Sequence, residues 1–258
     1  MKAVACDVIQ KTWTPEGSAE YGLFKLKTLE NDDLVRVIKK HITLAEGDLV
    51  LDVGGRDGTV AFQLTEATCV DIIDPDPSIL PLQAPHHFWR DRVQQVEFDP
   101  ARKYKLIICC HVMGYLGLQN VQKAVMEKLI EQLTEGGTLL LFYNTNEGYM
   151  GQLEQFSHHI QYTHYDYFDE AILGGYRTPD FEIKQLDVSY TLDCVDWLAL
   201  GRMCWFLFGT MAMEVDAVAR LFLPKLQHDL LEPTFEISER MTFITKRQNE
   251  ILFPTLTG

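Results

Sequence analysis

A glycine-rich turn follows an apolar run in the stretch LVLDVGGRDGTVAFQL, residues 49–64. Its glycines are Gly54, Gly55 and Gly58, and Asp52 stands two positions before the first of them. Glycine has no Cβ atom, so it adopts left-handed backbone conformations easily and lets a ligand approach the main chain closely. A turn of this kind, placed directly after a buried strand, is typical of a nucleotide-binding site.

The spacing of the glycines separates the possible nucleotides. A dinucleotide turn has the pattern G-x-G-x-x-G and a phosphate loop has G-x-x-x-x-G-K-S/T, and this stretch fits neither. Its D-x-G-x-x-x-G pattern resembles the first motif of class I S-adenosylmethionine-dependent methyltransferases. The resemblance implies S-adenosylmethionine as cofactor and S-adenosylhomocysteine as product, with the turn beside the amino-acid end of the cofactor.

Two charged residues of this turn have more than one interpretation. Arg56 stands where the family usually has a central glycine, and its side chain could contact the cofactor carboxylate or point into solvent. Asp52 could accept a hydrogen bond from the cofactor ammonium, or it could be a solvated acid at the end of a strand.

A further acid lies in the stretch VDIIDPDP. Asp74 follows Gly54 by about twenty residues, the place from which a strand-end carboxylate binds both ribose hydroxyls. Such an acid accompanies nicotinamide turns as well, but with the glycine spacing and the later stretch EGGTLLLF it favours a methyltransferase. Asp71 and Asp76 are rival acids, and Asp74 fits the strand end best. The neighbouring Pro75 belongs to the same predicted cofactor site.

From about Ser18 to Thr245 the chain also resembles the histamine N-methyltransferase family of small-molecule enzymes. The order and spacing of short stretches carry this resemblance: SAEYG, VGGRDG, IDPDPS, LIICCHVMGYL, QYTHYDYF, LDVSYTLDC, and LLEPTF followed by MTFIT. In that family the glutamate of the first stretch contacts the substrate, which implies a substrate-binding role for Glu20, although an exposed glutamate at a helix start is the alternative.

The resemblance also implies roles after the fourth strand of the sheet. His111 stands where the family has a polar glutamine, and Tyr115 holds the matching aromatic position. A strand end at this place lies over the cofactor crevice of such folds, so His111 is predicted to be catalytic and to border the cofactor. The alternative is that His111 is a surface histidine without a role.

The substrate site departs from the family pattern. The closing hairpin is several residues shorter, so the family's asparagine near the final strand falls at Glu239. The two aromatic residues that enclose the family's substrate ring have Tyr149, Phe156 and Phe206 as candidate equivalents. The Tyr-rich segment 147–168 is expected to close over the substrate, or else to pack as part of the core. These departures predict a substrate other than histamine.

The residue types predict methyl transfer to nitrogen. The site must hold the nucleophile about 3 Å from the methyl group and in line with the departing sulfur. An attacking amine must lose a proton, and His111 is the predicted acceptor, with Tyr115 orienting the substrate and Glu20 anchoring a cationic end. Methylation of an oxygen or a carboxylate would call for Arg or Lys in the pocket. A non-catalytic protein that binds S-adenosylmethionine or S-adenosylhomocysteine is the remaining alternative.

Charge and composition limit the partners. The chain has 258 residues, a net charge of −14 and 47% hydrophobic residues. Nucleic acids are bound through clusters of Lys and Arg, and only short basic pairs occur here, so we expect no nucleic-acid partner. No apolar run suits a signal peptide or a membrane helix, and no C-x-x-C pair suggests a metal. We expect a cytoplasmic enzyme without a metal that acts on a small molecule, as a monomer or a dimer.

Buried apolar strands that alternate with helices must position these residues. They predict an α/β fold with a doubly wound, Rossmann-like sheet of seven mostly parallel strands and an inserted helical substrate or lid region. The predicted strands are 48–54, 68–77, 103–112 and 136–144, with 180–190 and 234–246 as an antiparallel edge pair; the predicted helices are 31–42, 59–67, 119–133 and a buried helix within 197–213.

The whole chain, 1–258, is interpreted as one methyltransferase domain. Its predicted parts are an N-terminal helical cap at 1–45, a cofactor-binding core at 46–144, a substrate or lid region with late strands at 145–230, and a closing strand with a tail at 231–258.

Overall fold

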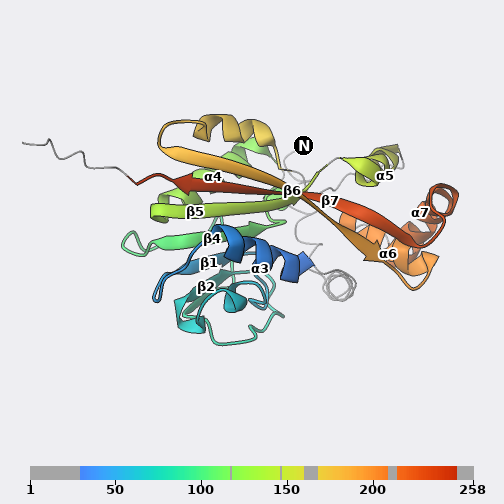
Figure 1. The fold of residues 1–258 in the computed structure, drawn as a ribbon. Coiled ribbons are helices and arrows are strands. Elements are labelled where there is room, and N and C mark those ends of the chain that lie inside the picture. The colour runs from blue at the N-terminus through green and yellow to red at the C-terminus, as the bar shows by residue number, and fades with distance from the viewer. Residues whose placement is uncertain (1–29, 117, 146, 160–167, 209–213, 249–258) are drawn as a thin grey trace, which may run out of the picture.

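A computed structural model describes residues 30–116, 118–145, 147–159, 168–208 and 214–248 of the chain. Seven strands form a single sheet in the order β3-β2-β1-β4-β5-β7-β6, as Figure 1 shows. Their bounds are Val50–Val53 for β1, Val70–Ile73 for β2, His87–Trp89 for β3, Tyr104–Cys110 for β4, Leu133–Asn144 for β5, Phe181–Asp193 for β6 and Thr234–Lys246 for β7. Strand β7 runs antiparallel to both of its neighbours, and the other pairs are parallel. The predicted fold class and the antiparallel edge pair are therefore confirmed.

The burial of each strand explains its place in the sheet. All residues of β1 and β2 are buried, as expected for apolar strands that are covered on both faces of a parallel sheet. Strand β6 instead alternates between exposed and half-buried residues over most of its length, which suits an edge strand.

Five α-helices accompany the sheet in the described ranges, namely α3 (Glu30–His41), α4 (Gln119–Glu131), α5 (Gly148–His159), α6 (Trp197–Phe208) and α7 (Val215–Asp229). Helix α3 buries Ile38 in a cluster with Phe142, whereas α4 buries Leu129 in a cluster with Leu141. Neighbouring residues of a strand point to opposite faces, so α3 and α4 cover opposite faces of β5. None of these helices has both the length and the apolar character that crossing a membrane requires.

One predicted helix is wrong. The segment 59–67 contains only a short 3₁₀ turn at Ala61–Gln63, and a second turn follows at Ala67–Cys69. Val60, Phe62 and Leu64 all pack against the core on the α3 side, although alternate positions of an α-helix face nearly opposite directions. The apolar spacing therefore favours an irregular segment. The three-residue strand β3 was not predicted, because so short a stretch carries no periodic pattern.

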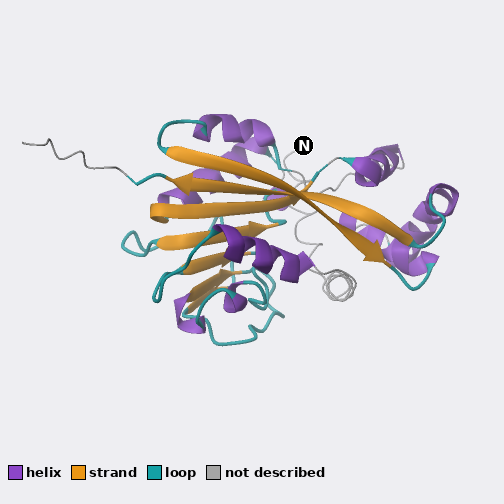
Figure 2. Cartoon of the chain, in the orientation of Figure 1, coloured by secondary structure: helices purple, strands orange, loops and turns teal. Residues whose placement is uncertain are grey.

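The strands β6 and β7 extend beyond the rest of the sheet as an antiparallel pair, which is plain in Figure 2. Strand β7 pairs with β5 only from Glu239 to Thr245, but it pairs with β6 along its whole length. Helices α6 and α7 connect the outer ends of the two strands, and α5 packs on β7. We call this extension the arm: residues 189–193 and 234–238 with α5, α6 and α7. It has a hydrophobic core of its own, around Leu200 and Phe222.

Candidate active site

Strand register places a row of polar residues along the carboxyl edge of the sheet. The row lies on the same face of the sheet that α3 packs against. Asn144 lies two positions after Phe142, which is on that face, and Asn144 is paired with Glu239 in the register of β5 and β7. By the same alternation Asp52 and Asp74 follow Val50 and Ile72 onto this face. We name two parts of the row after the roles that we propose for them below: the cofactor half, Asp52 and Asp74, and the acceptor half, His111, Asn144, Tyr190 and Glu239.

The glycines of the turn after β1 have two different reasons to be glycine. Gly54 and Gly58 have φ angles of 70° and 79°, in the left-handed region that favours glycine. At Gly55 a Cβ atom would lie 2.4 Å from the Cγ atom of Asp52. Because the buried carboxylate of Asp52 packs beneath the turn, Gly55 is required by the protein itself, even before any ligand is considered.

Arg56 occupies the central position of the turn in a left-handed conformation, with φ 50°. Its backbone N–H donates a hydrogen bond to Oδ2 of Asp74 at 3.0 Å. Its guanidinium Nη1 lies 3.9 Å from Oδ2 of Asp76, and the side chain is only 14% exposed. The guanidinium thus lies beside the acids after β2 and does not extend into solvent.

Asp74 is fully buried at the end of β2. Its Oδ1 accepts a hydrogen bond from the backbone N–H of Asp76 at 2.9 Å, while Oδ2 accepts the one from Arg56. Burial raises the pKa of Asp74 to about 6, although the two backbone amides and the Arg56 charge act in the opposite direction. A carboxylate oxygen has a second lone pair, so Asp74 can accept further hydrogen bonds from a ligand.

The rival acids, Asp71 and Asp76, accept hydrogen bonds from other residues of the protein. Asp71 accepts hydrogen bonds from Arg102 and from the hydroxyl of Tyr104, the latter at 2.7 Å, in the interior of the sheet. Asp76 accepts hydrogen bonds at Oδ1 from the N–H and the hydroxyl of Ser78. These contacts give Asp71 a structural role and leave Asp74 as the acid at the strand end.

His111 and Glu239, predicted separately, come together. His111 directly follows β4 with φ 54°, and its Nε2 lies 3.3 Å from Oε1 of Glu239. The hydroxyl of Tyr190 donates to the same Oε1 at 2.7 Å, and the ring of Phe142 contacts the imidazole edge to face at 5.1 Å. Glu239 is 1% exposed, so its carboxylate is held inside the protein against the imidazole.

Sequence reasoning missed Asn144 and Tyr190. Asn144 is the last residue of β5, is 4% exposed, and its Oδ1 accepts no hydrogen bond from any residue that the structure describes. Its one sequence signal was a polar residue at the end of the run LLLFYN. Tyr190 lay in a stretch whose resemblance was noted, but nothing in the sequence set its register against Glu239.

The other predicted residues of the cofactor and substrate sites lie outside the row or outside the described ranges. Tyr115 lies in the 3₁₀ turn Gly114–Leu116, and Pro75 lies half-buried between the two acids after β2. The ring of Tyr149 packs against Phe235 at 5.5 Å within the arm, in agreement with the core-packing alternative.

Two predicted substrate residues lie wholly or in part outside the described residues. Glu20 lies outside the described residues, and so does the side chain of Phe206, whose backbone belongs to α6. Their roles stay predictions. Nor do three His, Cys, Asp or Glu side chains gather as metal ligands would anywhere in the ranges that the structure describes.

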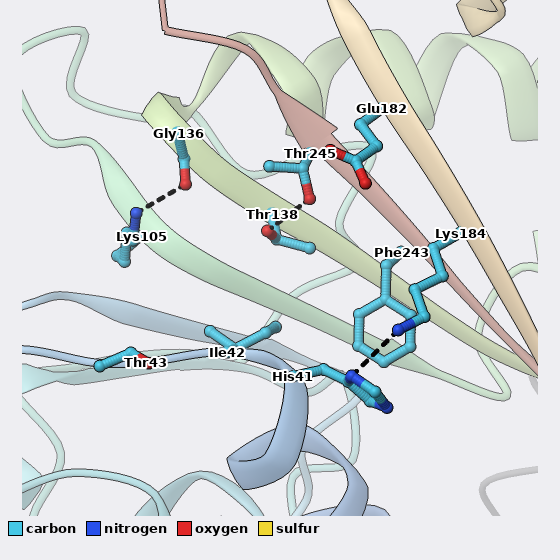
Figure 3. A pocket seen from close by; sticks show the side chains of 10 residues that line it. All are labelled: His41, Ile42, Thr43, Lys105, Gly136, Thr138, Glu182, Lys184, Phe243 and Thr245. Carbon is cyan, nitrogen blue, oxygen red and sulfur yellow. Dashed lines mark hydrogen bonds between the residues drawn. The ribbon is translucent and has the colours of Figure 1, made fainter.

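A separate pocket of about 400 Å³ lies at the opposite, amino edge of the sheet, where α3 ends (Figure 3). Lys184 Nζ lies 3.1 Å from Nδ1 of His41, and Lys105 Nζ donates to the carbonyl oxygen of Gly136 at 2.6 Å. Cations near the end of α3 complement the partial negative charge of a helix C-terminus. The pocket does not include any residue of the row.

The cofactor half fits the cofactor that the sequence implies. The glycine turn has no Cβ at positions 54, 55 and 58, and Asp74 presents a buried carboxylate beside it. Together they place the half-buried turn backbone at Gly54 and Gly55 beside an acceptor for ribose hydroxyls, the two features that a nucleoside of this type needs.

Comparison with known proteins gives the same picture. A family model described as a methyltransferase domain matches residues 27–176, more than half of the chain. No curated protein sequence matches significantly. Among solved structures, a Bacillus halodurans C-125 protein assigned as a methyltransferase has 14% identity and a TM-score of 0.57 over 83% of this chain and 99% of its own.

Two more solved structures share the fold. YcgJ of Bacillus subtilis has 13% identity and a TM-score of 0.54, with 83% of this chain and 98% of that chain covered. The plantazolicin methyltransferase BpumL, in complex with S-adenosylhomocysteine, has 11% identity and a TM-score of 0.53, with 93% and 95% covered.

Proposed function

Because the chain belongs to the methyltransferase-domain family and is an S-adenosylmethionine-dependent methyltransferase, we propose that it methylates a nitrogen of a small-molecule amine or imidazole. The observation that carries this proposal is the contact of His111 with the buried Glu239, which is itself held by Tyr190. A resemblance of the sequence to the histamine N-methyltransferase family supports the same substrate class.

In this proposal the cofactor half binds S-adenosylmethionine. Asp74 accepts hydrogen bonds from the ribose hydroxyls, Asp52 faces the ammonium group, and the backbone of Gly54 and its neighbours lines the amino-acid end, with Pro75 beside the nucleoside. The cofactor, when bound, supplies a methyl group on a sulfonium that a nucleophile can attack directly. The protein then has to position the nucleophile and remove one proton.

The dyad of His111 and Glu239 is suited to that proton transfer. Nε2 of His111 faces the carboxylate, so a proton on Nε2 leaves Nδ1 as the basic nitrogen of the ring. A neutral primary amine that gains a methyl group becomes a secondary ammonium, and His111 takes the proton to leave a neutral secondary amine. Glu239 stabilises the imidazolium that results, as the carboxylate of a catalytic triad does.

Charge favours nitrogen over oxygen nucleophiles. The acceptor half holds a carboxylate, an amide, an imidazole and a phenol, and none of its members is a Lys or Arg. A carboxylate substrate would be repelled by Glu239, whereas a neutral amine is not, and a second, cationic end of the substrate is attracted by the overall charge of −14. Tyr115 and Glu20 keep the roles predicted for them, orienting the substrate and anchoring its cationic end. Phe206 and Tyr149 remain candidate aromatic contacts.

A mass-spectrometric screen tests the proposal. The protein is incubated with S-adenosylmethionine and a panel of amines, imidazoles and carboxylic acids of similar size, and we expect methylated nitrogen compounds. His111→Ala should lower turnover about 10²- to 10⁴-fold and leave S-adenosylhomocysteine affinity unchanged. His228→Ala, at an exposed position of the arm, is the matched control. Methylated acids without methylated amines, or full turnover in His111→Ala, would overturn the proposal.

A further inference from the structure

We propose that Asn144 selects acceptor nitrogens that keep an N–H during the reaction, so that the enzyme adds one methyl group to a primary amine. This inference rests on the proposed function and names a narrower substrate class for the same site. Asn144 accepts the hydrogen bond of the retained N–H through Oδ1, while His111 accepts the proton that leaves.

The sheet holds Asn144 beside the dyad. Asn144 and Glu239 are directly paired across β5 and β7, so their side chains leave the same face of the sheet at the same level. Phe142, two residues earlier on that face, has its ring against His111. Asn144 is therefore the direct neighbour of Glu239 and lies two residues beyond the Phe142 ring that contacts His111, at the same carboxyl edge of the sheet as the cofactor half.

The burial of Asn144 calls for a partner. The residue is 4% exposed, and its Oδ1 is a buried atom that accepts no hydrogen bond from the described part of the chain. Buried amide oxygens in folded proteins are nearly always paired, because an unpaired one destabilises the native state. A substrate N–H that enters the acceptor half supplies the missing donor.

Two acceptors at one nitrogen limit the number of methyl transfers. A neutral primary amine carries two N–H groups, one for Asn144 and one that goes to His111 after the methyl group is bound. The secondary amine product carries a single N–H, which cannot satisfy both residues in a second reaction. A second methylation would leave Oδ1 of Asn144 unpaired in the transition state, and it is therefore disfavoured.

Sinefungin tests the role of Asn144 without a known substrate. It carries an amine at the position of the transferred methyl group, where S-adenosylhomocysteine carries no group. We expect wild-type protein to bind sinefungin more tightly than S-adenosylhomocysteine in titration calorimetry. Asn144→Leu should reduce that preference about tenfold, the value of one hydrogen bond, with unchanged S-adenosylhomocysteine affinity. Asn144→Asp, which keeps an acceptor, should retain the preference. Asn120→Leu, at an exposed position of α4, is the control.

The outcomes separate this inference from the proposed function. An unaltered preference in Asn144→Leu overturns the role of Asn144, and if Glu239→Gln lowers the preference in the same experiment, the amine site itself stands. A second readout uses a primary amine from the methylation screen: the wild type should yield the monomethyl product, and Asn144→Leu should yield at least fivefold more dimethyl product. Equal product ratios in the two proteins also overturn the inference.

Discussion

The two halves of the polar row are built in different ways. In the cofactor half the carboxylate of Asp74 is held by backbone amides, those of Arg56 and Asp76. In the acceptor half the carboxylate of Glu239 is held by side chains, those of Tyr190 and His111. A site made by the main chain tolerates changes of side chain around it, whereas a site made by side chains changes with each substitution. The first suits a cofactor that many enzymes share, and the second suits a substrate that differs between them.

The largest effect is expected at Asp74. Asp74→Asn should weaken binding of S-adenosylhomocysteine at least about 100-fold, because each hydrogen bond to a charged acceptor contributes about 1.5–3 kcal/mol. Titration calorimetry measures the affinity, and Asp76→Asn is the control for charge in the same loop. Binding within threefold of the wild type would mean that the cofactor half is misassigned.

The next largest effect is expected at Glu239, and it distinguishes the acceptor half from the cofactor half. Glu239→Gln keeps the shape of the side chain but cannot stabilise an imidazolium, so turnover should fall about 10²- to 10³-fold. S-adenosylhomocysteine should bind Glu239→Gln within twofold of the wild type. Glu236→Gln, at an exposed position of the same strand, should behave as wild type in both measurements. Loss of cofactor binding in Glu239→Gln would show that the two halves are not independent.

The raised pKa of Asp74 predicts a pH dependence confined to the cofactor half. Below the pKa of about 6 the carboxyl is protonated and accepts ribose hydroxyls poorly, so S-adenosylhomocysteine affinity should rise about tenfold from pH 5 to pH 7. The same binding curve in Asp74→Asn should be flat over this range. A rise of equal size in the variant would assign the pH effect to another group.

The raised pKa of Asp74 also makes the free energy of unfolding depend on pH. An ordinary aspartate has a pKa of 3.8 and Asp74 in the folded protein has a pKa of about 6, so the folded state binds the proton more tightly than the unfolded state. The contribution of Asp74 to the free energy of unfolding therefore falls as pH rises from 4 to 6, by about 3 kcal/mol at most, and is constant above that. Denaturant unfolding of wild type and Asp74→Asn at pH 4 and pH 7 measures this difference.

The smallest effect concerns the backbone of the turn. Arg56→Gly and Arg56→Ala both remove the contact with Asp76, but only glycine adopts a φ of 50° without strain. We expect Arg56→Gly to be more stable than Arg56→Ala by about 1 kcal/mol in urea unfolding. Equal stabilities would mean that the left-handed conformation is held at no cost by the surrounding loop.

The two halves also differ in how far the sequence predicts them. The cofactor half is encoded locally: the residues from Asp52 to Gly58 form one motif, and Asp74 follows at a regular distance. The buried strands β1, β2, β4 and β5 were predicted for the same reason, since short apolar runs and glycine spacing are local signals. The wrong helix at 59–67 lay where the chain packs irregularly against Ile72 and its neighbours.

The acceptor half depends on pairing between distant segments. Asn144 and Glu239 are almost a hundred residues apart, and only the register of β5 and β7 joins them. A shift of one residue in that register would turn Glu239 to the opposite face, and no local pattern determines such a shift. His111 and Glu239 were predicted through the family resemblance, but their contact was not, and Asn144 and Tyr190 were missed altogether.

The place of β7 between β5 and β6 has a consequence for how the chain folds. In the described structure β6 pairs only with β7, so β6 cannot join the sheet until β7 has inserted beside β5. Pairings between segments that are far apart in sequence form slowly, because a long loop must close first. We therefore expect a late folding step in which β7 arrives and brings Glu239 to His111. In that case a partly folded chain already holds the cofactor half that we propose for the nucleoside, while it still lacks the site that we propose for methyl transfer.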